Sequence, residues 1–308
     1  MKTLLITISL FIAISSCAKK EEKDSTGEDS TVNGFFVATG NNGTILKSSN
    51  GINWTSITTG TSENLRAGTY GGSTYVVVGY SGTILTSKDS NSWTSRTSGT
   101  TDNLTNLAYG NNTFLAIGTS GTILKSTDGI TWNSQTSGTT NSLYGVAYAK
   151  NTWIAIGDNG SILTSSDGTS WTSRTSGTTK RLLGVIYGND TFVAVGYGGT
   201  ILTSSDGITW TSRSTGIGNN FGLGGGNYAN SIFVIVGSTG VILTSSDSIN
   251  WTSRTSGTTN LLLGTSYGNN TFVTVGDSGT ILTSTDGTNW TSQNSGTTEY
   301  FRRLFFKE

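Results

Sequence analysis

The sequence predicts an all-β protein: a seven-bladed β-propeller of four-stranded antiparallel blades, in which the C-terminal strand completes the first blade. Seven of its eight tryptophans recur at intervals of 39, 39, 39, 39, 41 and 39 residues. An interval near 40 residues indicates one supersecondary unit per repeat, stacked on its neighbours. β-Branched runs and glycine-rich turns fill each interval, and residues 33–308 show no helical period. The repeating residues are Trp54, Trp93, Trp132, Trp171, Trp210, Trp251 and Trp290.

Within one unit the strands can be counted directly. Residues 182–214 contain four β-branched or apolar runs, joined by Gly-Asn-Asp, a glycine turn and the phrase Ser-Ser-Asp-Gly. Four short antiparallel strands per repeat are typical of a propeller blade. Each unit is therefore expected to form one blade.

The two ends of the repeat region predict how the ring closes. Residues 299–308 align with residues 102–111, a first strand, whereas residues 33–40 align with residues 111–118, which begin at a second strand. The C-terminal segment is thus expected to supply the missing inner strand of the first blade. Such a closure removes the exposed strand edges that an open array would carry. Residues 33–308 are filled by seven units, which leaves no second folded domain within them.

Each repeated tryptophan ends a phrase close to Ser-x-Asp-Gly-x-x-Trp, with asparagine for the aspartate in the first unit and serine for the glycine in the second and sixth. The aspartate and serine oxygens can accept backbone N–H groups across a tight turn, and glycine permits a positive φ. Each aspartate stands alone in its blade, without the second carboxylate that metal binding or acid–base chemistry requires. We therefore predict structural clamps, with no metal and no cofactor. The clamp residues are Asp89, Asp128, Asp167, Asp206, Asp247 and Asp286, with Asn50 in the first unit.

This phrase resembles the Asp-box (BNR) repeat of sialidases and of photosystem II assembly and stability factors, although it is one residue shorter than the usual form. The resemblance covers about 90% of the chain and implies a propeller fold. Sialidase chemistry would need an arginine triad, yet the sequence has no proline and hence no Arg-Ile-Pro motif. The recurrent arginines stand three residues after the tryptophan, on outer strands, where we expect them in solvent. They are Arg96, Arg174, Arg213 and Arg254.

The N-terminal segment differs in kind from the repeats. Apolar residues 4–14 predict a signal peptide over residues 1–16, too short to span a bilayer as a mature helix. Residues 14–17, Ile-Ser-Ser-Cys, resemble a bacterial lipobox, which implies lipid attachment to Cys17, the only cysteine. Residues 17–32 then form a polar tether that cannot bury enough apolar surface to fold. The alternative is an ordinary secretory signal with an incidental cysteine.

These expectations place the protein in a bacterial cell envelope, with a membrane as its partner through the lipid anchor. Ala18, by resemblance to bacterial sorting patterns, favours the outer membrane over the inner one. The sequence leaves open which side of the membrane the ring occupies.

Composition narrows the function classes. The sequence has no histidine, so Ser-His-Asp and Cys-His catalysis and histidine-ligated zinc are excluded. Removal of Lys2 with the signal peptide leaves 17 basic and 18 acidic residues, so no basic surface for nucleic acid is expected. We expect a monomeric, non-enzymatic binding or scaffolding module for a protein or glycan. The alternative is a sialidase-like glycoside hydrolase, which would need two carboxyl groups about 5–9.5 Å apart.

Divergence between the repeats indicates a candidate binding face. It concentrates in the turn between second and third strands and in the loop from the outer strand to the next inner strand, both of which open onto one face of a propeller. The two extra residues of the longest interval also lie there, within residues 217–226. The alternative is that these loops vary because nothing constrains them. The candidate ligand-binding residues are Arg66, Tyr80, Tyr144, Asp158, Lys180, Arg181, Tyr197, Phe221, Asp277, Tyr300 and Arg302.

One inner-strand position combines glycine and arginine. Gly145, Gly184, Gly225 and Gly264 occupy it in four blades, and Arg303 stands there in the closing strand. Glycine lets neighbouring backbones approach closely near the axis. We expect Arg303 to reach solvent at the end of the ring, with a small anion site at the channel mouth as the alternative.

Overall fold

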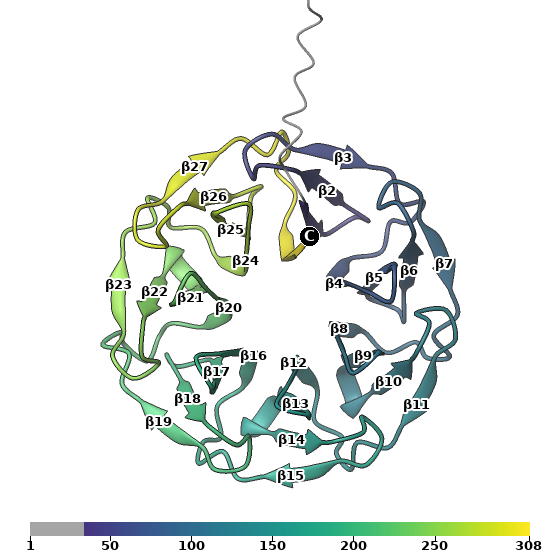
Figure 1. Cartoon of the computed structure of the whole chain (residues 1–308), viewed down its shortest axis with the longest axis horizontal. Coiled ribbons are helices and arrows are strands. Elements are labelled where there is room, and N and C mark those ends of the chain that lie inside the picture. The colour runs from purple at the N-terminus through teal and green to yellow at the C-terminus, as the bar shows by residue number, and fades with distance from the viewer. Residues whose placement is uncertain (1–33) are drawn as a thin grey trace, which may run out of the picture. The chain divides into compact units, whose positions relative to one another are not determined.

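The computed structural model describes residues 34–308, so the expected signal peptide, Cys17 and tether lie outside the described residues. The described residues form seven four-stranded antiparallel sheets arranged as a closed ring (Figure 1). We number the blades in chain order, beginning with the sheet β28-β1-β2-β3. The predicted fold class is confirmed. Within residues 34–308 no helix is long and apolar enough to cross a membrane.

The innermost strand of each blade faces the axis of the ring (Figure 1). These strands are β4 (Leu65–Gly71), β8 (Leu104–Gly110), β12 (Leu143–Ala149), β16 (Leu182–Gly188), β20 (Leu223–Ala229), β24 (Leu262–Gly268) and β28 (Phe301–Lys307). The second strands are β1 (Phe35–Gly40), β5 (Thr74–Gly79), β9 (Thr113–Gly118), β13 (Thr152–Gly157), β17 (Thr191–Gly196), β21 (Ile232–Gly237) and β25 (Thr271–Gly276).

The third and outermost strands are shorter, at four and three residues. The third strands are β2 (Ile45–Ser48), β6 (Ile84–Ser87), β10 (Ile123–Ser126), β14 (Ile162–Ser165), β18 (Ile201–Ser204), β22 (Ile242–Ser245) and β26 (Ile281–Ser284). The outer strands are β3 (Thr55–Ile57), β7 (Thr94–Arg96), β11 (Asn133–Gln135), β15 (Thr172–Arg174), β19 (Thr211–Arg213), β23 (Thr252–Arg254) and β27 (Thr291–Gln293).

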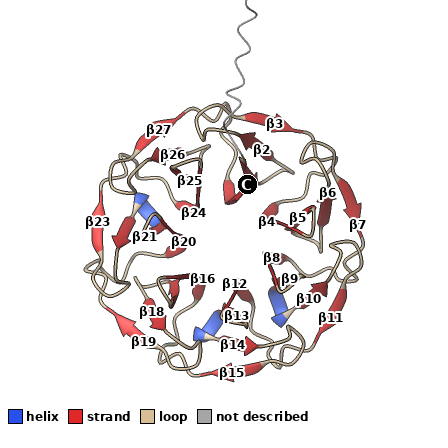
Figure 2. Cartoon of the chain, in the orientation of Figure 1, coloured by secondary structure: helices blue, strands red, loops and turns tan. Residues whose placement is uncertain are grey.

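Three turns between second and third strands form a single turn of 3₁₀-helix, the blue segments of Figure 2. They are η1 (Thr119–Gly121), η2 (Asp158–Gly160) and η3 (Ser238–Gly240). The sequence did not indicate them, because a three-residue turn is too short to produce a periodic pattern.

The ring closes as the alignment of the two ends predicts. Strand β28 pairs antiparallel with β1, with Phe36 opposite Phe306 and Ala38 opposite Leu304. Phe301 is completely buried in the closing strand. The last strand of the chain therefore hydrogen-bonds to the first described strand, and β1 is not an edge strand.

The core consists of seven apolar clusters between adjacent blades. In one of them, Val76 and Ile84 of blade 2 meet Leu104, Phe114 and Trp132 of blade 3. Because each cluster draws side chains from two blades, no blade can bury its faces alone. Each of the seven repeated indoles lies against or within such a cluster, and therefore packs between blades.

The Asp-box turn lies between the third and outer strands, and hydrogen bonds show how it is held. In blade 5, Asp206 Oδ1 accepts the N–H groups of Ile208 (2.8 Å) and Thr209 (2.9 Å). Ser204 Oγ accepts the N–H of Gly207 (2.8 Å) and donates to Asp206 Oδ1 (2.9 Å). The same pattern recurs around the ring, with Asn50 in blade 1. Each of these side chains therefore acts as a turn clamp.

The recurrent outer-strand arginines are braced, which corrects the expectation that they are free in solvent. Arg213 Nε donates to Thr203 Oγ1 of the adjacent third strand at 2.8 Å, and the side chain is half-buried. The long aliphatic part of the side chain allows the guanidinium to fold back onto the sheet while part of the guanidinium remains in contact with solvent. Equivalent bonds are made by Arg96, Arg174 and Arg254.

Candidate functional site: the axial pocket and its loop face

A β-bulge interrupts the start of every inner strand. In blade 5 the register passes from Leu182 opposite Gly196 to Gly184 opposite Val195, so Leu183 has no partner of its own. An extra residue of this kind bends the strand and turns its side chain away from the regular alternation. We call the seven bulge residues the axial ring. They are Arg66, Thr105, Tyr144, Leu183, Gly224, Leu263 and Arg302.

The axial ring and Arg303 together line one pocket of about 50 Å³ at the axis. Three of its eight lining residues are arginines, and none is a carboxylate. The other polar lining side chains are Thr105 and Tyr144. The lining is thus cationic and rich in hydrogen-bond donors, although the whole chain carries no net charge. We call this cavity the axial pocket.

Arg66 contributes the first guanidinium of the axial pocket from the start of β4. Burial lowers the pKa of Arg66, and the neighbouring positive charge of Arg302 lowers it further. Arg66 Nη1 donates to the Tyr80 hydroxyl at 3.4 Å, and the guanidinium lies 5.5 Å from the centre of that ring. The Tyr80 ring therefore supports a cation that has no carboxylate partner in the pocket lining.

Arg302 contributes the second guanidinium from the start of β28. It stacks on the ring of Tyr300, with the guanidinium carbon 3.9 Å from the ring centre, and Nε donates to Asn41 Oδ1 at 3.1 Å. Burial raises the pKa of Tyr300, so its hydroxyl stays neutral. Two neighbouring side chains thus fix the direction of the Arg302 guanidinium.

Arg303 contributes the third guanidinium, and its position corrects the expectation that it reaches solvent. Its side chain turns into the ring, where Nη1 donates to the carbonyls of Gly224 (3.0 Å) and Leu263, and Nη2 donates to Leu183 (3.2 Å). Burial lowers the pKa of Arg303 to about 10, and the positive charge of Arg66 is a second, smaller cause. Arg303 therefore stays charged at neutral pH and links three blades at the floor of the axial pocket.

A second cluster of candidate residues lies beside the axial ring. Arg181 forms an ion pair with Asp158, whose other oxygen accepts the Tyr144 hydroxyl at 3.2 Å. The Arg181 guanidinium also lies 5.0 Å from the ring of Tyr144 and 5.6 Å from that of Tyr197. Tyr197 is 47% exposed, the most exposed large aromatic of this face. The cluster joins blades 4 and 5 above the axial pocket.

The remaining candidates lie on the same face. Phe221 is half-buried in the loop before β20, where its carbonyl accepts the N–H of Gly199 at 2.8 Å. Lys180 is exposed in the loop before β16. Asp277 follows β25 and accepts the Ser278 N–H at 2.7 Å. The candidate set therefore divides into an inner group around the axis and a periphery that includes Lys180 and Phe221.

Carboxylates of this face are engaged by neighbouring turns. Asp102 accepts the Thr122 hydroxyl at 2.6 Å, and Glu63 accepts the Ser81 hydroxyl at 3.3 Å. Glu299 accepts both of its bonds from the amide of Asn42, at 3.1 and 3.2 Å. These acidic groups tie adjacent loops together, which leaves the pocket lining itself without a negative charge.

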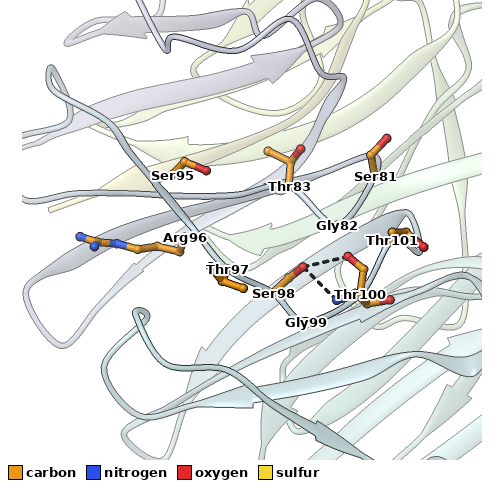
Figure 3. Close-up of a pocket in the computed structure, with 10 residues that line it drawn as sticks. All are labelled: Ser81, Gly82, Thr83, Ser95, Arg96, Thr97, Ser98, Gly99, Thr100 and Thr101. Atoms are coloured by element: carbon orange, nitrogen blue, oxygen red, sulfur yellow. Dashed lines mark hydrogen bonds between the residues drawn. The ribbon is translucent and has the colours of Figure 1, made fainter.

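A larger depression of about 720 Å³ lies on the outer side of blade 2, lined by residues 81–83 and 95–101 (Figure 3). Its lining consists of serine, threonine and glycine around Arg96, and Ser98 accepts the N–H of Thr100 at 3.3 Å. A copy of about 630 Å³ occurs on blade 4. Because the repeat reproduces it, this depression is a consequence of the blade turn and marks no individual site.

Several solved structures have a similar fold. The structure of YCF48 bound to D1 peptide has a TM-score of 0.63 and 17% sequence identity, over 78% of this chain and 84% of that one. The fold is similar to that of YCF48. The structure of YCF48 from Cyanidioschyzon merolae gives a TM-score of 0.58 at 17% identity, over 74% and 84% of the two chains.

A computationally designed protein, Ika8, is also similar, with a TM-score of 0.59 and 12% identity over 86% of this chain and 82% of that one. No family model and no curated protein matches the sequence. At such low identities the similarity to YCF48 and Ika8 concerns the fold, so the expected resemblance to assembly-factor propellers is confirmed at that level.

Sequence reasoning found part of the axial pocket and missed part of it. Arg66, Tyr144 and Arg302 were selected because the repeats diverge at these positions. Thr105, Leu183, Gly224 and Leu263 were missed, because the residue types at the bulge differ from blade to blade. The signal that could have found them is the residue before the bulge: in all seven blades it is a leucine or phenylalanine, and the structure buries it completely.

Proposed function

We propose that this protein is a lipid-anchored, non-enzymatic binding module of the bacterial cell envelope that holds an acidic segment of a partner protein at the axial pocket. One observation carries the proposal: Arg66, Arg302 and Arg303 line a single pocket that contains no carboxylate. Positive charges held close together lower one another's pKa, as Arg302 does for Arg66. A bound carboxylate would relieve that repulsion and accept charge-assisted hydrogen bonds.

The arrangement of the pocket favours recognition over chemistry. Bulged strands and the rings of Tyr80 and Tyr300 hold the guanidinium groups of Arg66 and Arg302 in place before any ligand binds. This preorganisation lowers the entropic cost of binding. A glycoside hydrolase would need two carboxyl groups in one pocket, whereas the acidic groups Glu63, Asp102 and Glu299 bind neighbouring turns. The geometry thus supports a binding module better than a sialidase-like enzyme.

A protein partner suits the surroundings of the pocket. Tyrosine and arginine are enriched at the centres of protein interfaces, and this face combines Tyr80, Tyr144, Tyr197 and Tyr300 with its arginines. The structure of a protein of similar fold, YCF48, contains a bound D1 peptide, which is a precedent for peptide binding by this fold. The mixed aromatic and cationic rim therefore fits an extended acidic peptide.

The remaining parts of the proposal concern the domain plan. We infer a signal peptide over residues 1–16, a lipidated Cys17 with a tether to residue 32, and an Asp-box propeller over residues 33–308 that acts as a monomer. The outer membrane is favoured. Growth with a labelled fatty acid tests the anchor: the wild-type chain should incorporate the label and Cys17→Ala should not. Equal labelling of both would refute lipidation at Cys17.

Binding can be tested on the full chain with a fluorescent oligo-aspartate peptide and, separately, with sialyllactose. We expect the peptide to bind and its affinity to fall with rising salt. Arg66→Ala with Arg302→Ala should weaken binding by about 100-fold or more, since two hydrogen bonds to charged groups are lost and each contributes roughly 1.5–3 kcal/mol. Arg174→Ala, which removes an equally charged outer-strand residue, is the matched control and should change nothing.

Two results would contradict this function. Unchanged peptide affinity in the double variant, with its melting temperature preserved, would remove the axial pocket from the binding site. Binding of sialyllactose alone, lost in the same variant, would replace the acidic peptide with an acidic glycan.

A further inference from the structure

The face opposite the axial pocket carries a repeated apolar residue. Four Asp-box turns present an isoleucine two residues after the clamp, and each is close to half exposed: Ile52 48%, Ile130 43%, Ile208 49% and Ile249 49%. One exposed isoleucine is ordinary on a protein surface. Four at the same position of a repeated turn, at the same end of their blades, form a pattern. We call this end of the ring the Asp-box face.

The clamp holds these side chains outward. The N–H of each isoleucine donates to the clamp oxygen, at 2.9 Å for Ile52, 2.8 Å for Ile130, 2.8 Å for Ile208 and 2.9 Å for Ile249. The turn backbone is therefore fixed where each side chain leaves it, and the exposed isoleucines do not belong to a mobile loop. The three other blades carry Asn91, Thr169 and Thr288 at this position.

The repeat gives this face a flat geometry. Each Asp-box turn joins a third strand to an outer strand, and the seven blades are arranged around one axis (Figure 1). Equivalent turns of a ring lie at the same height along its axis, so their tips share one plane. A plane of rigid tips matches a flat partner better than a peptide or a convex protein.

The chain also enters the ring at this face. Asn269 Nδ2 donates both to the carbonyl of Gly34, the first described residue, at 3.1 Å and to the carbonyl of Ser49 in the Asp-box turn of blade 1 at 2.7 Å. Sixteen residues separate Cys17 from Gly34. A lipid on Cys17 would therefore be joined to the ring through a residue on its Asp-box side.

From these observations we propose that the Asp-box face rests on the surface of a phospholipid bilayer, with Ile52, Ile130, Ile208 and Ile249 entering the boundary between headgroups and acyl chains. The proposal rests on the lipid anchor of the proposed function. It adds an orientation, in which the axial pocket faces away from the membrane toward soluble partners.

Charge on this face selects the kind of lipid. Its clamp aspartates are ionised at neutral pH, because backbone N–H groups lower their pKa values. Lysines such as Lys88 and Lys150 stand among them and do not outnumber them. No excess of positive charge attracts anionic headgroups, so a zwitterionic surface is the expected partner. Four half-exposed side chains are enough to hold this face on the bilayer only because the anchor keeps the ring close to it.

Tryptophan quenching by brominated lipid measures this contact, since each repeated tryptophan follows its isoleucine position by two residues. The lipid-modified full chain is reconstituted into phosphatidylcholine vesicles that contain acyl-brominated phosphatidylcholine. A second preparation carries an N-terminal hexahistidine tag and is held by a nickel-chelating lipid, so it is attached whatever happens at Cys17. Flotation reports attachment, and quenching reports docking.

We expect quenching in both preparations, at least halved by the four substitutions Ile52→Thr, Ile130→Thr, Ile208→Thr and Ile249→Thr. Threonine already occupies this position in blades 4 and 7, so the variant should keep the fold. A gain variant, Asn91→Ile with Thr169→Ile and Thr288→Ile, should be quenched more than wild type. Val241→Thr is the control on the opposite face, where other blades carry threonine.

The outcomes separate the two proposals. Failure of the lipid-modified chain to float would refute the anchor, while the tagged preparation still tests docking. Flotation without quenching, or quenching that the isoleucine substitutions leave unchanged, would refute docking. Quenching that appears only when phosphatidylglycerol is added would show an electrostatic contact and overturn the apolar one proposed here.

Discussion

At the scale of single residues, the Asp-box serine and its aspartate, or Asn50 in blade 1, decide the local structure of the turn in every blade. Ser204 is almost completely buried, and its hydroxyl both accepts the Gly207 N–H and donates to Asp206. Gly207 has a φ of +74°, a conformation in which glycine is not strained. The turn therefore depends on one hydroxyl, one carboxylate and one backbone conformation.

Replacing Ser204 with alanine should destabilise the protein by about 1–3 kcal/mol, because the Gly207 N–H would remain buried without an acceptor. Thermal and urea unfolding would measure the loss. Ser212→Ala, an exposed serine on the neighbouring outer strand, is the control. A loss of similar size in both variants would contradict the role of the hydroxyl.

Acid should weaken the same clamps together. The backbone N–H groups of Ser92 and Asn91 lower the pKa of Asp89 to about 2, and those of Ser170 and Thr169 do the same for Asp167. A carboxylate whose pKa is lower in the folded than in the unfolded state stabilises the fold above the unfolded value, near 4, and loses that effect as the pH falls toward 2. The urea midpoint should therefore drop between pH 4 and pH 2, and a flat midpoint across that range would contradict the clamp model.

At the scale of strands, the inner elements approach one another closely around the axis. A Cβ added to Gly225 would lie 2.6 Å from Arg303 Nη1 and 2.8 Å from the carbonyl oxygen of Leu263. Glycine in β20 thus makes room for the arginine of β28. The two positions are equivalent in the repeat, so a small residue in one blade permits a large one in another.

Gly225→Ala should destabilise the protein by about 1–3 kcal/mol through overpacking at the axis. Gly218→Ala is the matched control, because an added Cβ there lies 3.9 Å from the nearest atom, on Phe221. In the background of Arg303→Ala the cost of Gly225→Ala should shrink, which a double-mutant cycle measures. Additive costs would show that the two residues do not compete for space.

At the scale of the whole molecule, stability depends on closure of the ring. Strand β28 pairs with β1 and supplies Phe301 and Leu304 to the cluster between blades 7 and 1. Without it, β1 would expose an edge strand and two interblade clusters would lose side chains. Closure therefore couples the last residues of the chain to the first described ones.

Phe301→Ala should cost about 3–5 kcal/mol, the usual range for a fully buried phenylalanine. Deleting residues 299–308 should lower the melting temperature further and broaden the transition in calorimetry. Glu308→Ala, at an exposed residue that directly follows the same strand, is the control. A truncated chain that melts like wild type would mean that the ring does not depend on its last strand.

Much of this architecture follows from periodicity alone. The spacing of the tryptophans predicts the blade count, the offset between the two ends predicts the closure, and the Ser-x-Asp-Gly phrase predicts the clamps, because each depends on short segments that repeat in register. The lipid anchor stays a prediction because it falls on residues 1–33, outside the described residues. The binding role stays a prediction because it depends on which ligand the axial pocket accepts.

The sequence by itself determined the seven blades, the identity of the closing strand and the face on which the loops diverge. Only the tertiary structure decided that Arg66, Arg302 and Arg303 share one axial pocket, and that Arg303 turns inward to carbonyls of three blades. The reason is physical: a repeat specifies which residues occupy equivalent places, whereas a bulge and the space left by glycines in distant strands determine where a side chain points.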